Sequence, residues 1–427
     1  MRLKHGLLNT FEQGLNRVAD AATTIALVRY LSPETFSKLG LAQAAVAPLL
    51  LLFISPEAVL YRDFAKWKQG APAELIARLK ALRFFGWGKL QAAFFLSLVA
   101  AALHSGESYW NRFFALIWAF SLALAPQISG ADREYLRLDL RLKQLNAITL
   151  TQKLLLLLGT IWVVLFRPTE IAYLALVALS SALVGAFMAH AFVKKALPQG
   201  GSGTFLITQR QVISEAIGSF SIWRHLSGVI TNWVQTLDLF FLGFVFRFPA
   251  RLIGLYSAAL KIGNFSNALP MALANSISVW IAQGEAKDQN SEILRLKKTG
   301  FYFTVLCVVQ GMVFWLLLPL LTNSIGSLHQ TVEEAAEMVV WMRWILVGNS
   351  LLCCTYPVTS WIAQRGFITT LFWKVQLPWV LLTALTYGIG AWKWGAQGAA
   401  VGNSIVAVLY LFLVVRVTKA VTTTQKI

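Results

Sequence analysis

Acidic residues and cysteines are few in this sequence. Its 427 residues include 19 Asp and Glu against 37 Lys and Arg, and charged residues make up only 13% of the chain, about half of the roughly 25% usual in soluble domains. The three cysteines, Cys307, Cys353 and Cys354, lie in apolar stretches without metal-ligand spacing or a nearby His. We therefore expect no soluble globular fold, no disulfide framework, no metal site and no cofactor.

Long apolar stretches take the place of the missing charge, since 57% of the residues are hydrophobic. A membrane-spanning helix needs roughly 20 apolar residues, and about twelve such stretches follow one another with short polar breaks. They lie near 8–31, 39–60, 83–103, 111–131, 145–166, 171–193, 218–246, 252–282, 300–322, 335–361, 367–390 and 396–416. The sequence predicts an all-α membrane protein with no sizeable soluble domain. Glu12, Arg17 and Asp20 interrupt the first stretch, so we expect it to remain as a span and not to be cleaved as a signal peptide.

The basic residues follow the alternation of the loops. With a cytoplasmic N-terminus, most of the 37 Lys and Arg residues lie in the even-numbered loops and at the termini, whereas the opposite side holds only Lys38, Arg112, Arg167, Arg247, Arg251 and Lys393. Positive charge is enriched on the cytoplasmic side of membrane proteins. We expect a multi-pass protein of the bacterial cytoplasmic membrane with both termini in the cytoplasm. The net charge of +18 then reflects topology and gives no reason to expect a nucleic-acid partner.

The chain also divides into two halves. A Gly-rich polar stretch without the pattern of a phosphate-binding loop separates the sixth and seventh predicted spans. A weak repeat supports this division, because Gly40-Leu41-x-x-Ala44-Ala45 and Gly254-Leu255-x-x-Ala258-Ala259 open corresponding spans of the two halves. Paired repeats with the substrate site between them are a recurrent transporter plan. We expect two pseudo-symmetric six-helix bundles around a central cavity, formed by residues 1–197 and 217–427 and joined by a cytoplasmic linker at 198–216.

Some basic residues remain inside the predicted spans: Arg17, Arg29, Lys89, Lys153, Arg224, Lys261, Arg343 and Lys374. A charge in the hydrocarbon is costly, so such residues face the protein interior or a wet cavity. For Arg29, Lys89 and Lys153, which lie near predicted span ends, we expect the side chain to reach the headgroups instead. Arg17, Lys261 and Arg343 are predicted to lie deeper, whereas the sequence does not decide between the two positions for Arg224 and Lys374. Polar stripes follow the first, seventh and eighth spans, where Asn9, Gln13, Arg17, Asp20 and Thr24 share one face, as do Arg224, Ser227, Thr231, Gln235 and Asp238, and as do Ser257, Lys261, Asn264 and Asn275.

These stripes predict a wet cavity with an excess of positive charge. An excess of positive charge in a medium of low dielectric favours an anionic ligand, and Arg can bind phosphate bidentately. We expect Arg17, Arg224, Lys261, Arg343 and Lys374 to line the cavity and bind an anionic headgroup. Asp20 and Asp238 are candidates for binding a coupling cation, or they neutralise nearby basic residues. In an alternative interpretation, the stripes only join helices through hydrogen bonds.

The sequence resembles the polysaccharide (O-antigen type) flippases of the multidrug/oligosaccharidyl-lipid/polysaccharide exporter superfamily. The segments that carry the likeness are Arg29 to Phe36 before Gly40, Asp238 to Gly243, Gly254 to Ala259 with Lys261 and Ile262, and Gly395 to Ala400. One departure is Ser37, where the family often has Gly. The resemblance implies a V-shaped pair of six-helix bundles that moves a polyprenyl-pyrophosphate-linked oligosaccharide by alternating access, often driven by an ion gradient.

The resemblance also implies that the protein is no enzyme, that it works as a monomer among membrane lipids, and that a polysaccharide polymerase is a partner. Three other functions stay open: a peptidoglycan-precursor flippase, a multidrug antiporter of the same superfamily, and a membrane-embedded polysaccharide polymerase or ligase. A site for cationic drugs would be acidic and aromatic, and a polymerase would need a large outer loop with catalytic residues. The basic interior and the short loops favour the exporter of lipid-linked oligosaccharides.

Overall fold

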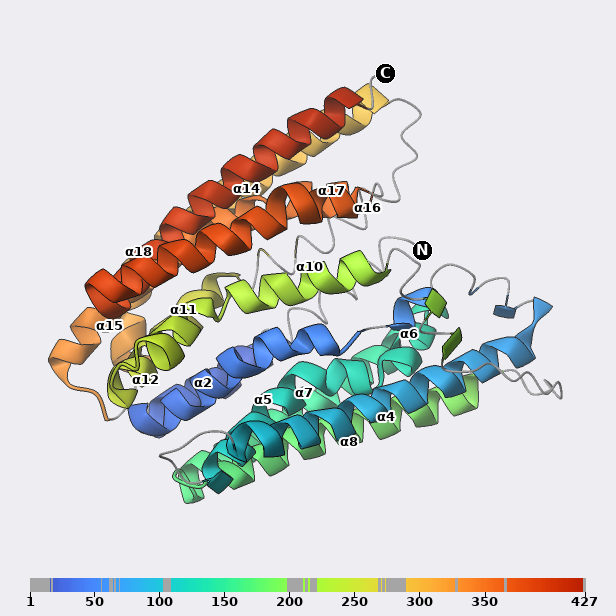
Figure 1. Ribbon diagram of the computed structural model, residues 1–427, viewed down its shortest axis with the longest axis horizontal. Helices are drawn as coiled ribbons and strands as arrows, with labels where there is room; N and C mark the ends of the chain where they lie inside the picture. Colours follow the sequence, from blue (N-terminus) through green and yellow to red (C-terminus); the bar gives the residue numbers. More distant parts are fainter. Residues whose placement is uncertain are drawn as a thin grey trace. The chain divides into compact units, whose positions relative to one another are not determined.

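A computed structural model describes residues 16–267 and 289–424, except for gaps at 17, 55, 61–63, 65–66, 69, 103–108, 198–209, 212–213, 216–220, 327–328 and 365–366, together with residues 270 and 273. The described residues form helices and no strand, which confirms the all-α prediction (Figure 1). They contain eight helices long and apolar enough to cross a membrane, or nine if one bent pair is counted as a span. The protein is therefore a multi-pass membrane protein.

The predicted spans and the observed helices agree where both can be compared. The long apolar segment Ile368–Thr422 contains the last two predicted spans, since its helix breaks at Gly395. The seventh predicted span is the bent pair His225–Val234 and Leu237–Val245, which meet at 58°. The first and eighth predicted spans lie partly outside the described residues.

The contacts divide the chain into two compact units, here called unit 1 (Met1–Ala44 with Ile230–Ile427) and unit 2 (Ala45–Val229). This grouping places the first 44 residues with the C-terminal helices, whereas the predicted bundles place them with residues up to 197. The predicted linker, 198–216, lies mostly outside the described residues and stays a prediction.

Unit 2 is built around four long helices: α4 (Pro72–Ala102), α5 (Tyr109–Ile128), α7 (Leu142–Phe166) and α8 (Ile171–Ala196). Helix α5 packs against α4 and α8, and α8 also packs against α7 (Figure 1). The short helix α6 (Gly130–Leu138) packs against α4, α7 and α8, and the 3-10 turn η2 (Pro56–Val59) packs against α6; another 3-10 turn, η1 (Leu50–Leu52), precedes η2 in the chain. Close packing of α4 on α5 depends on Gly86, because a Cβ atom there would lie 2.5 Å from the carbonyl oxygen of Ile128.

Lys89 contradicts the expectation that it reaches the headgroups. Its side chain is buried in unit 2, and its Nζ lies 3.2 Å from Oε1 of Glu57 and 3.3 Å from Oε1 of Gln127. A buried ammonium needs a paired charge, and Glu57 supplies it from a turn 32 residues earlier in the chain. Hydropathy does not reveal such a partner.

Unit 1 contains the C-terminal helices and most of α2, and some of these helices line the site described below. Its helices are α2 (Pro33–Leu49), α10 (Ser221–Val234), α11 (Leu237–Phe240), α12 (Ala250–Gly263), α14 (Gln289–Ile325), α15 (Val332–Cys354), α16 (Tyr356–Gln364), α17 (Ile368–Leu371) and α18 (Leu377–Thr424). The last five residues of α2 and the start of α10 belong to unit 2. The 3-10 turn η4 (Asn264–Asn267) follows α12. Two segments, η3 (Phe241–Val245) and η5 (Phe372–Gln376), are π-helical.

Helix α18 consists of two helices that fold back on each other. Gly395 has φ of 58° and ψ of −137°, a conformation open essentially to Gly alone. A Cβ atom at Gly390 would lie 2.6 Å from the carbonyl oxygen of Gly398, and one at Gly398 would lie 2.0 Å from that of Gly390. The two arms therefore touch through their backbones, and residues further along each arm face one another across the hairpin.

Candidate functional site

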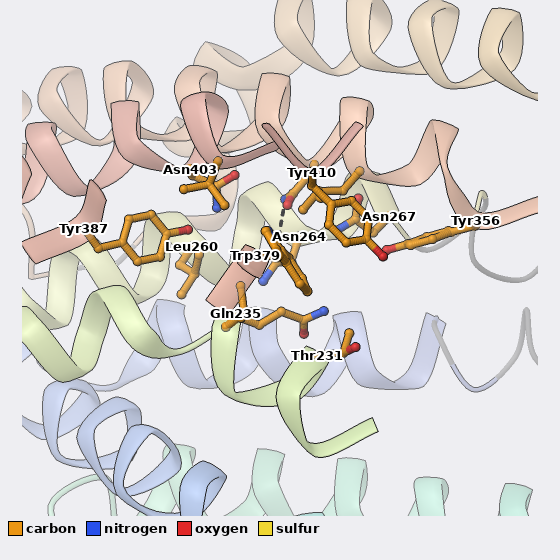
Figure 2. A pocket seen from close by; sticks show the side chains of 14 residues that line it. Thr231, Gln235, Leu260, Asn264, Asn267, Tyr356, Trp379, Tyr387, Asn403 and Tyr410 are labelled. Atoms are coloured by element: carbon orange, nitrogen blue, oxygen red, sulfur yellow. Dashed lines mark hydrogen bonds between the residues drawn. The ribbon is translucent and has the colours of Figure 1, made fainter. Parts of the chain in front are cut away.

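A polar pocket lies inside unit 1 (Figure 2). Helix α10 and the two arms of α18 contribute to its wall, and α12 with η4, α15 and α16 complete it. The lining residues are Thr231, Val234, Gln235, Leu260, Asn264, Asn267, Asn349, Leu352, Tyr356, Trp379, Tyr387, Asn403, Val406 and Tyr410. None of them carries a charge, whereas five carry an amide. The pocket, as the described residues line it, is thus neutral and rich in hydrogen-bonding groups.

Amide side chains fix one wall of the pocket to neighbouring helices. Asn349 of α15 donates from Nδ2 to Oδ1 of Asn264 at 2.8 Å, and the same Nδ2 lies 3.4 Å from the carbonyl oxygen of Gly263. The thiol of Cys353 donates to Oδ1 of Asn267 at 3.0 Å. These bonds tie η4 to α15 and orient the two amides in the pocket wall.

An aromatic pair forms another part of the wall. The rings of Trp379 and Tyr410, from opposite arms of α18, have centroids 4.4 Å apart, as the hairpin at Gly395 requires. Trp379 is 3% exposed, and its Nε1 is buried without a hydrogen-bond partner. The Oδ1 of Asn403 is likewise buried and without a partner. Buried polar groups are nearly always hydrogen-bonded, so these two atoms call for a ligand or water.

A charged cluster lies next to the pocket. Asp238 is fully buried, and its Oδ2 accepts a hydrogen bond from the hydroxyl of Tyr256 at 2.8 Å while its Oδ1 accepts one from the backbone N–H of Leu239 at 2.7 Å. Lys261 interacts electrostatically with Asp238 and with Asp20. Asp238 also interacts with Tyr387, which lines the pocket. Three of the predicted site residues, Asp20, Asp238 and Lys261, are thus brought together.

The other predicted site residues are not brought to this cluster. Arg343 of α15 places its guanidinium 5.1 Å from the ring centroid of Trp315 on α14. Lys374 lies exposed on η5. Arg17 lies outside the described residues, and Arg224 is described only as part of the backbone of α10.

Sequence reasoning found part of the pocket. The polar stripes named Thr231, Gln235 and Asn264, which do line it. Asn349, Asn403 and the aromatic residues were missed, because single polar residues in long apolar stretches show no periodicity of their own. An amide in a span, which must find a partner in the interior, is the signal that could have singled them out.

The pocket is narrow in this conformation. The centre of a water molecule can occupy about 50 Å³ of it, whereas pockets for drug-sized ligands measure roughly 300–1,000 Å³. The pocket can hold water as it stands, and a larger ligand requires it to widen.

Comparison with solved structures identifies the fold. The chain is similar to an inward-facing multidrug resistance MATE family transporter of the MOP superfamily, with a TM-score of 0.66, 14% identity, and 96% of each chain covered. It is similar to the lipid II flippase MurJ in an inward closed conformation, with a TM-score of 0.63 and 11% identity over 97% of this chain and 87% of that one.

A third match is a MOP superfamily transporter from Pyrococcus furiosus, for which reverse polarity of the binding pocket suggests a different function; its TM-score is 0.66, with 13% identity over 98% of this chain and 96% of that one. No family model and no curated protein matches the sequence. At these identities the likeness shows the fold alone, so the chain has the all-α, two-lobed architecture of these transporters.

Proposed function

We propose that this protein exports a polyprenyl-pyrophosphate-linked oligosaccharide across the bacterial cytoplasmic membrane by alternating access. The fold supports a transporter, since similar structures include inward-facing and outward-facing transporters and a flippase of lipid II. In this proposal Arg17, Arg224, Lys261, Arg343 and Lys374 bind the anionic headgroup. Asp20 and Asp238 bind a coupling cation or neutralise the basic residues.

The observation that carries the proposal is the state of Arg343. The residue lies midway along α15, a span of 23 residues, and its Nε is buried without a hydrogen-bond partner. The described residues offer its guanidinium an aromatic ring but no carboxylate. A cation at that depth is costly unless an anion joins it. A phosphate group matches the planar fork of Arg and would supply the missing partner.

The neutral pocket favours this function over a multidrug antiporter. An organic cation is best held by carboxylates and aromatic faces, and no carboxylate is among the described residues that line the pocket. A peptidoglycan-precursor flippase shares the lipid pyrophosphate headgroup, so only the sugars distinguish it. A polymerase or ligase would require catalytic groups, and the fold gives no support for it.

The test measures carrier binding by the full chain in nanodiscs. We expect undecaprenyl pyrophosphate to bind the wild type, and we expect Arg343→Ala to weaken binding at least tenfold, because a hydrogen bond to a charged group contributes about 1.5–3 kcal/mol. Arg343→Lys should fall between the two. The control is Lys393→Ala, which removes a cation that lies over the ring of Trp394 and should leave binding unchanged.

Two outcomes would contradict the proposal. One is equal carrier affinity of Arg343→Ala and the wild type, with both proteins folded by circular dichroism. The other is tight binding of ethidium, an organic cation, by a protein that does not bind undecaprenyl pyrophosphate. The second result would instead support a multidrug antiporter.

A further inference from the structure

We propose that the polar pocket of unit 1 binds a sugar ring of the transported molecule. This inference rests on the proposed function and adds a subsite for the neutral part of the cargo, separate from the cationic groups that meet the headgroup. It starts from the chemistry of the wall: five amides, a threonine, three tyrosines and a tryptophan, with no charged side chain among the described lining residues (Figure 2).

The two buried atoms without partners define what the ligand must offer. Nε1 of Trp379 can only donate a hydrogen bond, and Oδ1 of Asn403 can only accept one. A hydroxyl group serves both, because it carries one donor and two acceptor lone pairs. A neutral molecule that carries hydroxyls therefore satisfies both atoms.

The positions of these two residues indicate a ligand larger than one water molecule. Trp379 packs against Tyr410 of the opposite arm of α18 with the two rings tilted by 45°. Asn403 lies on the same arm as Tyr410, two turns earlier, or about 10 Å along the helix axis. Different hydroxyls of one ligand can reach the two positions. A ligand that reaches both positions carries several hydroxyls along its length, as a sugar does.

The aromatic pair suits the apolar part of the same ligand. A sugar ring has C–H groups on its faces and hydroxyls around its rim. Tyr and Trp combine an apolar ring with a polar group at its edge. At Trp379 and Tyr410 an aromatic surface and hydrogen-bonding groups lie in one wall, next to the amides.

A metal cation fits the pocket less well. It would need several amide oxygens as ligands, but two of the five, Oδ1 of Asn264 and Oδ1 of Asn267, already accept from Asn349 and Cys353. The buried N–H of Trp379 would point its positive end at a cation. The narrow pocket must widen to admit a sugar, so binding belongs to another stage of the transport cycle.

The experiment compares two carriers in nanodiscs that contain the full chain: undecaprenyl pyrophosphate alone, and the same carrier with a single N-acetylglucosamine attached. Free N-acetylglucosamine, galactose and glucose form a third arm, with binding followed by saturation-transfer NMR. The variants are Trp379→Phe, which keeps an aromatic ring but removes the N–H, and Asn403→Leu. The control is Trp373→Phe, at a tryptophan that is 53% exposed in the neighbouring η5.

We expect the wild type to prefer the sugar-bearing carrier. Trp379→Phe should weaken binding of the sugar-bearing carrier about three- to tenfold, the worth of one neutral hydrogen bond, and leave binding of the bare carrier unchanged. Asn403→Leu should act in the same direction. Trp373→Phe should change neither affinity.

Three results would overturn the inference while the proposed function stands: equal affinity of the wild type for both carriers, equal weakening of both by Trp379→Phe, or a pocket that holds water only when the sugar-bearing carrier is bound. If the chain bound neither carrier but bound free sugar in a manner that Trp379→Phe abolished, the proposed function would fail and the sugar site would stand. If it bound none of the probes, both would fail.

Discussion

At the scale of single residues, the buried pair of Lys89 and Glu57 shows how unit 2 accommodates charge. Both side chains are almost completely buried, and Gln127 completes the hydrogen bonding of the ammonium. Gly130 makes room for the carboxylate, because a Cβ atom there would lie 2.8 Å from Oε1 of Glu57. Removing one partner of a buried pair leaves the other charge uncompensated, which costs far more than the net contribution of the pair.

We therefore expect Lys89→Met to destabilise the protein by about 3–5 kcal/mol. The double variant Lys89→Met with Glu57→Gln should recover most of that loss, because no charge then remains buried. Urea unfolding in detergent, followed by tryptophan fluorescence, measures both. A single variant as stable as the wild type, or a double variant worse than the single one, would show that the two residues are not coupled.

At the scale of helices, the two arms of α18 depend on glycines at their contact. Small residues allow helix backbones to approach closely in membranes, and Gly390 and Gly398 each occupy the space that the other's side chain would need. The same hairpin brings Trp379 against Tyr410. The contact between Trp379 and Tyr410 in the pocket wall thus depends on glycines about three turns away.

Gly398→Ala should destabilise the protein by about 1–3 kcal/mol, the usual cost of overpacking, because the new methyl group meets backbone and not a side chain that can move. Gly88→Ala is the matched control. A Cβ atom at Gly88 has no neighbour within 4 Å, so the change should be neutral or stabilise α4 by up to about 1 kcal/mol. Thermal unfolding of both variants decides this, and equal melting temperatures would contradict the backbone contact.

Helix positions were predictable from the sequence, but pairings between helices were not. Hydropathy located the spans, and the Gly395 segment marked the entry to the last one. The partner of Lys89 and the packing of Trp379 against Tyr410 depend on which helices become neighbours, and periodicity along one helix carries no information about that. The stripes did identify Asp20, Asp238 and Lys261, because those residues share polar faces with several others.

At the scale of the whole molecule, topology is the property that the sequence predicts most directly. The positive-inside pattern predicts that both termini lie in the cytoplasm and that the break at Gly395 lies on the outer side. The ion pairs of Arg251 with Glu34 and Glu334 lie at the same predicted outer end, where they join the first turns of α2, α12 and α15.

Reporter fusions test this topology in a bacterial host. Green fluorescent protein fused after Ile427 should fluoresce, because it folds in the cytoplasm, whereas alkaline phosphatase fused within the Gly395 break should be active outside. Exchanging the two reporters should silence both. Active phosphatase at the C-terminus would reverse the predicted orientation and would place the proposed export in the opposite direction.

The π-helical turns η3 and η5 have a consequence for comparing this chain with other sequences. A π turn holds one residue more than the corresponding α turn, so it absorbs an insertion while the helix on either side keeps its contacts. In η5 the extra residue rotates all later residues around the helix axis. A helical wheel drawn with 3.6 residues per turn would therefore misplace Trp379 relative to Lys374. Sequences that lack the extra residue need a one-position gap inside the span, and an ungapped alignment would pair the wrong residues from there onward.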